Sequence, residues 1–186
     1  MGTCSSTSKA AAVHIDPGEG RLGLAIIVRG GRGLGGKSEK QSDPYVKLRV
    51  GETGSAWESK SETTERHSRV VYGSNTPVWD LVAFVTVPSS QLSTMELHLK
   101  VNDRDIFTRD DALGEARVPL APLHREGKEQ EVALVRSSES ATPAFISVAC
   151  TAPDSTLARE MAQHGVSHGW LGAMGQYYST RADDAR

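Results

Sequence analysis

Carboxylate side chains are concentrated in two short polar segments of this sequence. The first, residues 42–48, contains Asp43, and the second, residues 103–114, contains several aspartates in one polar loop. Crowded carboxylates repel one another, so such a cluster usually exists because a cation screens it. Oxygen ligands at irregular spacing suit Ca²⁺ better than zinc or iron. The pattern therefore predicts a calcium site.

The two segments resemble the calcium-binding loops of C2 domains, the antiparallel β-sandwiches that dock signalling and trafficking proteins onto phospholipid membranes. The resemblance spans roughly residues 21–151. It includes residues 77–80, which look like the family's Asn-Pro-x-Trp-Asn segment, with Thr76 where Asn is usual. The resemblance implies Ca²⁺ as the cofactor, with these ligands: Asp43, Asp103, Asp105, Asp111 and the backbone carbonyl of Arg104.

One position departs from the family's pattern. Where the family has a second aspartate before Asp43, this chain has Lys37. An ammonium removes one ligand and repels the ion, by about 4 kcal/mol at roughly 4 Å and an effective dielectric near 20. Lys37 can turn into solvent and Glu39 can replace the missing ligand, so we expect fewer ions or weaker binding. The alternative is a C2-like domain that has lost its metal and keeps the aspartates as loop caps.

The same loops predict membrane binding. Without metal, the aspartates repel a negatively charged leaflet, and bound Ca²⁺ inverts that field. Ile106 and Phe107 stand at the predicted loop tip, where apolar side chains can enter the lipid interface, and Arg104 and Arg109 flank them and suit anionic headgroups. The alternative for Phe107 is a side chain folded back onto the sandwich. Trp79, at an apolar strand position, is predicted to lie in the core.

Composition limits the class of partner and compartment. The net charge of −2 and the lack of a dense Lys/Arg run argue against a nucleic acid partner. The two cysteines, Cys4 and Cys150, stand near opposite ends, so a reducing compartment fits. No apolar run approaches the roughly 20 residues of a membrane span. We expect a cytoplasmic protein, peripheral or lipid-anchored on the cytoplasmic face of a membrane.

The first residues match a lipid-attachment pattern. Residues 1–6 fit Met-Gly-x-x-x-Ser/Thr, in which removal of Met1 exposes Gly2 for myristoylation, and Cys4 is a natural palmitoylation site. One myristoyl chain binds membranes only marginally, so a second signal is needed, either Cys4 or the domain itself. The alternative is a flexible leader that matches a short pattern by chance.

A competing motif lies just before the first aspartate. Residues 31–38 fit Gly-x4-Gly-Lys-Ser, the phosphate-binding P-loop, and follow an apolar strand. A P-loop must open a helix whose amides face the phosphates. Pro44 and a predicted strand follow too soon after Lys37 for a helix to form, so we interpret these glycines as a flexible loop.

The chain divides into a flexible leader (1–20), a C2 domain (21–151) and a C-terminal tail (152–186). Alternating apolar residues predict an all-β fold, an eight-stranded antiparallel β-sandwich of the C2 type. The predicted strands are residues 22–28, 46–50, 68–72, 79–87, 95–101, 112–120, 130–136 and 144–151.

The tail is expected to be partly helical or disordered. Apolar residues at helical spacing predict a short helix over residues 155–163, and later glycines interrupt any longer one. An apolar-aromatic patch over residues 170–178 is expected to dock either on the sandwich or on a protein partner.

No catalytic constellation is evident in the sequence, so we expect a binding module and not an enzyme. The main hypothesis is Ca²⁺-regulated binding to anionic phospholipid, for recruitment in signalling or trafficking. The alternatives are a Ca²⁺-independent, acyl-anchored scaffold that binds protein through its tail, and a nucleotide-binding protein that uses residues 31–38.

Overall fold

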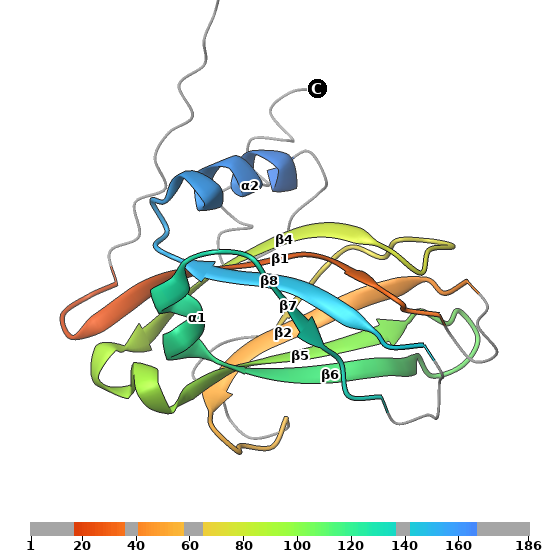
Figure 1. Cartoon of the computed structure of the whole chain (residues 1–186), viewed down its shortest axis with the longest axis horizontal. Coiled ribbons are helices and arrows are strands. Elements are labelled where there is room, and N and C mark those ends of the chain that lie inside the picture. The colour runs from red at the N-terminus through yellow and green to blue at the C-terminus, as the bar shows by residue number, and fades with distance from the viewer. Residues whose placement is uncertain (1–16, 36–40, 58–64, 137–141, 167–186) are drawn as a thin grey trace, which may run out of the picture.

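Two four-stranded antiparallel β-sheets, packed face to face, form the body of the molecule (Figure 1). The computed structural model describes residues 17–35, 41–57, 65–136 and 142–166. The strand order is β4-β1-β8-β7 in the first sheet and β3-β2-β5-β6 in the second, so the expected antiparallel sandwich is confirmed. The strands are β1 (Arg21–Arg32), β2 (Pro44–Glu52), β3 (Arg66–His67), β4 (Val78–Pro88), β5 (Met95–Asp103), β6 (Asp111–Pro119), β7 (Gln130–Ala133) and β8 (Phe145–Thr151).

The space between the sheets is filled by side chains that alternate along the strands. Leu24 and Ile26 of β1 belong to one buried cluster with Leu48 of β2, because every second side chain points to the same face of a strand. Trp79 belongs to the same cluster, which confirms its predicted core position. Asp80 beside it has a φ of 50°, a left-handed conformation that Asp and Asn tolerate better than most residues.

The predicted strand over residues 68–72 is wrong. β3 contains only Arg66 and His67, and the chain then crosses from the second sheet to β4 in the first. Along this crossing only single backbone bonds form with β2, from the N–H of Ser68 to Val46 and from the N–H of Val71 to Pro44. Two adjacent valines resemble a strand locally, but a segment that joins two sheets cannot stay in either ladder.

A short helix between β6 and β7 was also not predicted. The strand expected over residues 112–120 ends at Pro119, and α1 (Leu120–Glu126) follows. The helix ends at Gly127, whose φ of 61° is the left-handed conformation typical of a helix C-terminus. Leu120 and Leu123 are buried in the main core and anchor the helix. A short 3-10 helix, η2 (Ser89–Thr94), joins β4 to β5.

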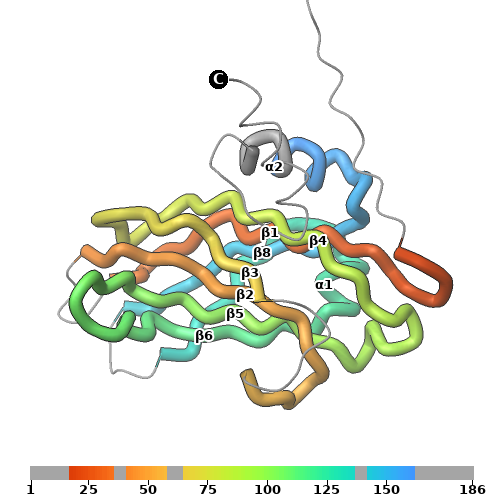
Figure 2. Tube along the Cα trace, turned by 180° about the vertical axis from the view of Figure 1, so that it is seen from behind, coloured from red at the N-terminus to blue at the C-terminus, as the bar shows by residue number. Residues whose placement is uncertain are grey.

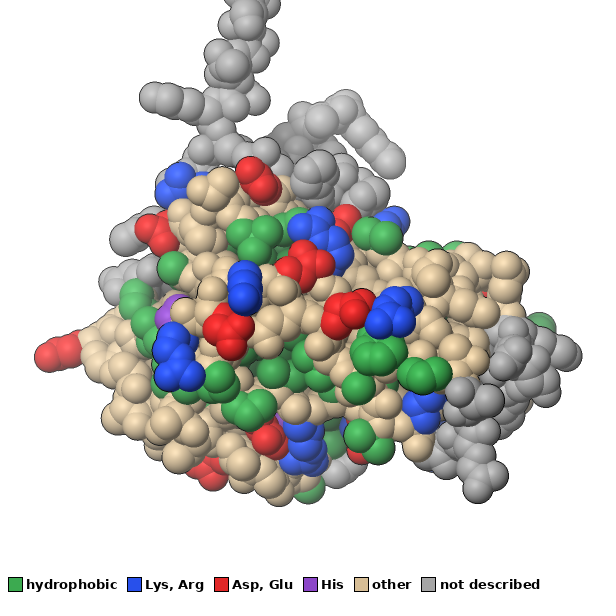
Figure 3. All heavy atoms as spheres, viewed as in Figure 1, with side chains coloured by type: hydrophobic (Ala, Val, Ile, Leu, Met, Phe, Trp, Pro, Cys, Tyr) green, Lys and Arg blue, Asp and Glu red, His purple; other side chains and the backbone are tan. Residues whose placement is uncertain are grey.

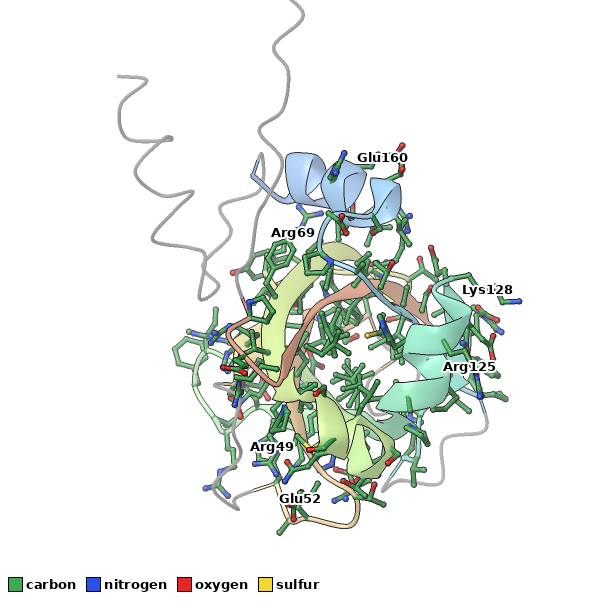
Figure 4. The ribbon with its side chains drawn as sticks, turned by 90° about the vertical axis from the view of Figure 1, so that its left-hand side faces the viewer. Arg49, Glu52, Arg69, Arg125, Lys128 and Glu160 are labelled. Carbon is green, nitrogen blue, oxygen red and sulfur yellow. The ribbon has the colours of Figure 1, made fainter. Side chains whose placement is uncertain are left out.

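The tail helix is present and packs onto the sandwich. α2 (Thr156–Val166) begins one residue after the predicted start, and it continues through Gly165, so the expected interruption at this glycine is wrong. Ser155 caps its start, because its hydroxyl oxygen accepts a bond from the N–H of Ala158 (3.1 Å). Figure 4 shows α2 lying over the outer face of the first sheet, with Glu160 pointing away from it. The expected patch over residues 170–178 lies outside the described residues.

An apolar second cluster explains why α2 docks there. Ala25 and Ile27 of β1 and Phe84 of β4 point away from the main core and pack with Ala158 and Met161 of α2. β1 is therefore buried on both faces, and its run of consecutive apolar residues is the sequence pattern typical of such a strand.

The outer face of the second sheet is polar but partly covered. Glu96 and His98 of β5 are only 6% and 2% exposed, although their alternation with apolar residues would suggest solvent-facing positions. The guanidinium of Arg49 lies against the ring of Trp57 (5.2 Å to its centroid), so residues 53–57 partly cover this face.

The face of the molecule seen in Figure 3 carries charges of both signs close together. Arg29 pairs with Glu129 (3.1 Å) and Arg32 with Glu131 (2.8 Å) across β1 and the β7 region. The described part of this face therefore presents no large single-sign patch. Within the described residues, no helix is both long and apolar enough to cross a membrane.

The topology argues against the P-loop interpretation. β1, which contains Gly31, is antiparallel to both of its neighbours, whereas a P-loop requires a parallel strand followed by a helix. β2 begins at Pro44, and residues 41–43 before it are not helical. Lys37 and Ser38 lie outside the described residues.

Candidate metal centre

The aspartates predicted to bind metal meet where three strands end. In the ladders, Pro44 lies opposite Asp103, and Asp103 lies opposite Asp111. Asp43 therefore stands directly beside Asp103, although they are far apart in the chain. Figure 2 shows the loops that follow β1, precede β4 and follow β5 projecting from the same end of the sandwich. We call their described residues the first loop (residues 33–35 and 41–43), the second loop (71–77) and the third loop (104–110).

Hydrogen bonds hold Asp43 against the third loop. Its N–H donates to Oδ1 of Asp103 (2.6 Å), and its carbonyl accepts from the N–H of Arg104 (3.0 Å). The N–H of Gly73, on the second loop, donates to Oδ1 of Asp43 (2.7 Å). All three loops thus meet at this one residue. The backbone carbonyl of Arg104 remains a predicted ligand.

Asp103 lies at the electrostatic centre of the group. Partial burial raises its pKa above the usual range, and the carboxylates of Asp43, Asp105 and Asp111 raise it further. The N–H of Asp43 lowers it, but by less than the sum of these effects. The four predicted carboxylates therefore act on one another, and an ionised Asp103 lacks sufficient positive charge nearby.

The carboxylate side chains are not arranged around a common point as the ligands of a bound metal ion are. Among the described residues, no three side chains of His, Cys, Asp or Glu are arranged closely enough to hold a metal ion. The donor set still fits a hard cation, because it is made of carboxylate oxygens in the charge environment of Asp103. Lys37 and Glu39 lie outside the described residues, so their predicted effects stay predictions, as does acylation at Gly2 and Cys4.

A further aspartate, which sequence reasoning did not single out, shapes the third loop. Oδ2 of Asp110 accepts a bond from the hydroxyl of Tyr45 (2.5 Å), and its Oδ1 accepts from the N–H of Asp105 (3.1 Å). Burial and this bond raise the pKa of Tyr45 to about 12, and the same bond lowers the pKa of Asp110. Asp110 is thus a positioning residue. In the sequence, only its position next to Asp111 indicated that Asp110 could belong to the site.

The first loop is held by an arginine that was also missed. The guanidinium of Arg136, which follows β7, donates to the carbonyls of Gly33 (3.2 Å) and Gly35 (2.6 Å). Ser42 secures the other end of the loop, since its hydroxyl donates to the carbonyl of Leu34 (2.5 Å). Backbone carbonyls carry no sequence pattern, so this contact could not be read from the chain.

The predicted lipid-contacting residues stand at the tip of the third loop. Phe107 is 97% exposed and Ile106 is 81% exposed, so Phe107 does not fold back onto the sandwich. Arg104 and Arg109 are also exposed. The tip therefore combines apolar and cationic side chains beside the carboxylates.

Comparison with known proteins decides the family. The family model of the C2 domain matches residues 23–134, which is more than half of the chain. The chain belongs to the C2 domain family. The resemblance inferred from the two loops is therefore confirmed.

Relatives of this C2 domain protein include plant and animal proteins. The chain is 37% identical over 86 residues to the 16 kDa phloem protein 2 of Arabidopsis thaliana, covering 46% of this chain and 49% of that protein. It is 31% identical over 100 residues to the ADP-ribosylation factor GTPase-activating protein AGD12 of Arabidopsis thaliana (54% and 26%). With human synaptotagmin-4 the identity is 30% over 112 residues (58% and 24%). The chain spans about half or less of the length of these relatives.

Solved structures share the C2 fold at low identity. A single C2 domain of plant extended synaptotagmin 1 superposes with a TM-score of 0.55 at 16% identity, covering 70% of this chain and 92% of that one. The calcium-bound pair of C2 domains from extended synaptotagmin 2 gives a TM-score of 0.52 at 22% identity, covering 69% and 45%. Family and fold together support a membrane-binding C2 module.

Proposed function

We propose that this protein is a peripheral membrane module that binds anionic phospholipid under the control of Ca²⁺ at the cytoplasmic face of a membrane. It is a binding module and not an enzyme, and it brings the protein to the membrane for signalling or trafficking. The observation that carries the proposal is the meeting of Asp43 with Asp103, beside the almost fully exposed Phe107.

The charge of the loop end supports regulation by a cation. Asp43, Asp103, Asp105 and Asp111 would hold the ion, together with the carbonyl of Arg104. In its absence their charge repels an anionic leaflet, and Asp103 already lies in an unfavourable environment for a carboxylate. When bound, Ca²⁺ would neutralise this charge and leave coordination positions for lipid phosphate or carboxylate oxygens. Arg104 and Arg109 would then contact anionic headgroups.

The distribution of apolar side chains supports docking by the same end. Among the described residues, most of the large hydrophobic side chains that are exposed lie on or beside the three loops: Tyr72, Val78, Ile106 and Phe107. Val78 pairs with Gly30 near the end of β1. The remaining one, Val135, lies away from the loops, because it bridges Glu115 in the middle of β6. Apolar side chains gathered on one end mark an interaction surface.

Acylation at Gly2 and Cys4 is part of the proposal as a second attachment. β1 begins at Arg21, at the end of the sandwich opposite the three loops. The leader must therefore run along the length of the domain for both attachments to reach one membrane. Residues 2–17 can extend to roughly 50 Å at about 3.3 Å per residue, which exceeds the roughly 40 Å spanned by the 12 residues of β1.

Vesicle co-sedimentation tests the proposal. We expect the unacylated protein to bind phosphatidylserine-containing vesicles in Ca²⁺ and to be released by EGTA. Asp105→Asn should remove the Ca²⁺ effect, and Lys37→Asp should lower the Ca²⁺ concentration required. Equal binding in Ca²⁺ and EGTA would contradict control by Ca²⁺. No binding in either would contradict the proposed function and favour the Ca²⁺-independent scaffold, which needs its acyl chain to reach a membrane.

A further inference from the structure

The second loop is fixed to the candidate site more firmly than its sequence suggests. The N–H of Ser74 donates to the carbonyl of Ser42 (2.8 Å), and the N–H of Leu34 donates to the carbonyl of Asn75 (3.0 Å). Oδ1 of Asn75 also accepts from the N–H of Ser42 (3.3 Å). The first and second loops therefore form one connected unit beside Asp43.

A glycine brings the second loop into contact with a predicted ligand. Gly73 has a φ of 62°, which side chains rarely adopt, and this conformation directs its N–H to Oδ1 of Asp43. The residue before it, Tyr72, is 72% exposed. The tyrosine is thus held one residue away from the carboxylate group, on a loop fixed by backbone bonds.

We infer that Tyr72 is a third membrane contact, which enters the interfacial layer of the phospholipid bilayer together with Ile106 and Phe107. This inference rests on the proposed function and adds a loop to it. Tyrosine suits the interface because its ring is apolar and its hydroxyl remains hydrated. With contacts on both the second and the third loop, the domain would dock with the loop end of the sandwich toward the lipid. Two separate contacts would also prevent the domain from rotating about the third loop.

The nature of the neighbouring side chains favours lipid as the occupant. Tyr72 shares the end of the sandwich with Phe107 and Ile106, which are almost fully exposed, and with the cationic Arg104. Isolated apolar side chains on separate projecting loops make a discontinuous surface. A fluid interface can surround each of them, whereas a folded protein partner would need a pocket for each.

Site-specific fluorescence tests the inference directly. In a Cys4→Ser background of the full chain, Tyr72→Cys, Phe107→Cys and Ser90→Cys are each labelled with the polarity-sensitive dye NBD. Cys150 is buried and stays unlabelled. Ser90 is exposed on η2 at the opposite end and serves as the control. The vesicles contain phosphatidylcholine and phosphatidylserine, with and without a doxyl-labelled lipid as quencher, in Ca²⁺ or EGTA.

We expect the dyes at positions 72 and 107 to shift to shorter wavelength in Ca²⁺ and to be quenched by the doxyl lipid, with no change at position 90. A shift at position 107 without one at position 72 overturns the inference but leaves the proposed function intact. No shift at either position contradicts the proposed function as well.

Substitution without a label provides an independent measurement. Tyr72→Ala is expected to weaken vesicle binding about tenfold, the loss from removing one partly buried aromatic ring. Thr76→Ala, an exposed position on the same loop, should have no effect. Ca²⁺ affinity without vesicles should be the same in both, because the bond to Asp43 comes from the backbone of Gly73. Unchanged vesicle binding in Tyr72→Ala would overturn the inference.

Discussion

Two acidic residues on the same strand, Glu96 and Asp103 of β5, lie in opposite electrostatic environments. Glu96 accepts bonds through Oε1 from Arg117 (2.8 Å) and the N–H of Gly54 (3.2 Å), and lies 2.7 Å from Nε2 of His98. Burial raises its pKa, but these donors together bring it below the usual value. Asp103 has one backbone donor and three neighbouring carboxylates, and its pKa is raised. Glu96 has a cationic partner, Arg117, within the fold, whereas Asp103 lies among carboxylates.

The sharpest test of this difference is removal of the charge at Asp103. Removing a group that only supports a metal ligand lowers metal affinity by about 10–100-fold, and removing a ligand itself lowers it further. Asp103→Asn should therefore weaken Ca²⁺ binding by at least about 100-fold. The same change should raise the stability of the Ca²⁺-free protein, since the raised pKa means that the ionised form is unfavourable in the fold. Calorimetric titration and urea unfolding in EGTA measure the two effects. The exposed Asp154→Asn is the matched control, and a less stable Asp103→Asn would contradict the comparison.

The corresponding change at Glu96 should have the opposite sign. Glu96→Gln removes the charge that serves Arg117 and the buried His98, and we expect a loss of about 2 kcal/mol in the free energy of unfolding. Urea unfolding in EGTA again provides the measurement. Glu115→Gln, at an exposed ion pair on the neighbouring β6, should change it by less than about 0.5 kcal/mol. Equal effects of the two substitutions would mean that the hydrogen bonds around Glu96 stabilise the fold no more than an exposed ion pair does.

Weakening the contacts that hold the first loop should affect Ca²⁺ binding near Asp103 and leave the surroundings of Glu96 unchanged. Arg136→Lys keeps the charge but loses the planar fork that contacts Gly33 and Gly35, so we expect Ca²⁺ affinity to fall up to about tenfold. Arg125→Lys, on α1 at the far side of the molecule, is the control, and calorimetry reports the affinity (Figure 4). An unchanged affinity would show that the first loop is positioned by other contacts.

The smallest effect concerns pH at the Glu96 end. Burial lowers the pKa of His98, while Glu96 opposes the shift. The unfolded chain therefore binds a proton before the folded one does, and stability should fall as the pH drops below about 6.5. Stability that depends on ionised Glu96 should be lost at lower pH still, because its folded pKa is depressed. His98→Gln should flatten the first decline in urea unfolding, and an unaltered slope would exclude His98 as its source.

The parts of the site that follow from local sequence were predictable. Asp43, Asp103 and Asp111 flank strands with clear apolar alternation, so the antiparallel register brings them to one end. The exposed tip at Phe107 followed from the same spacing. The roles of Gly73 and Arg136 were not predictable, because each contact joins residues far apart in the chain through backbone or carbonyl groups, which are the same for every residue type.

The fold shows the same division. The core strands were predictable from period-two alternation, but the crossing over residues 68–72 and the burial of Glu96 and His98 were not. Position within a strand tells which face a side chain points to. It does not tell what covers that face, and here α2 covers one sheet and the segment with Trp57 covers part of the other.

By itself, the order of residues along this chain determined the antiparallel sandwich, its apolar interior and the supply of acidic oxygens at one end. Only the folded arrangement decided which aspartate lies among other carboxylates, which tyrosine stands near it, and that the first sheet is covered on its outer side. The physical reason is range: alternation acts between neighbours along the chain, whereas electrostatic compensation and coverage depend on elements that meet only after folding.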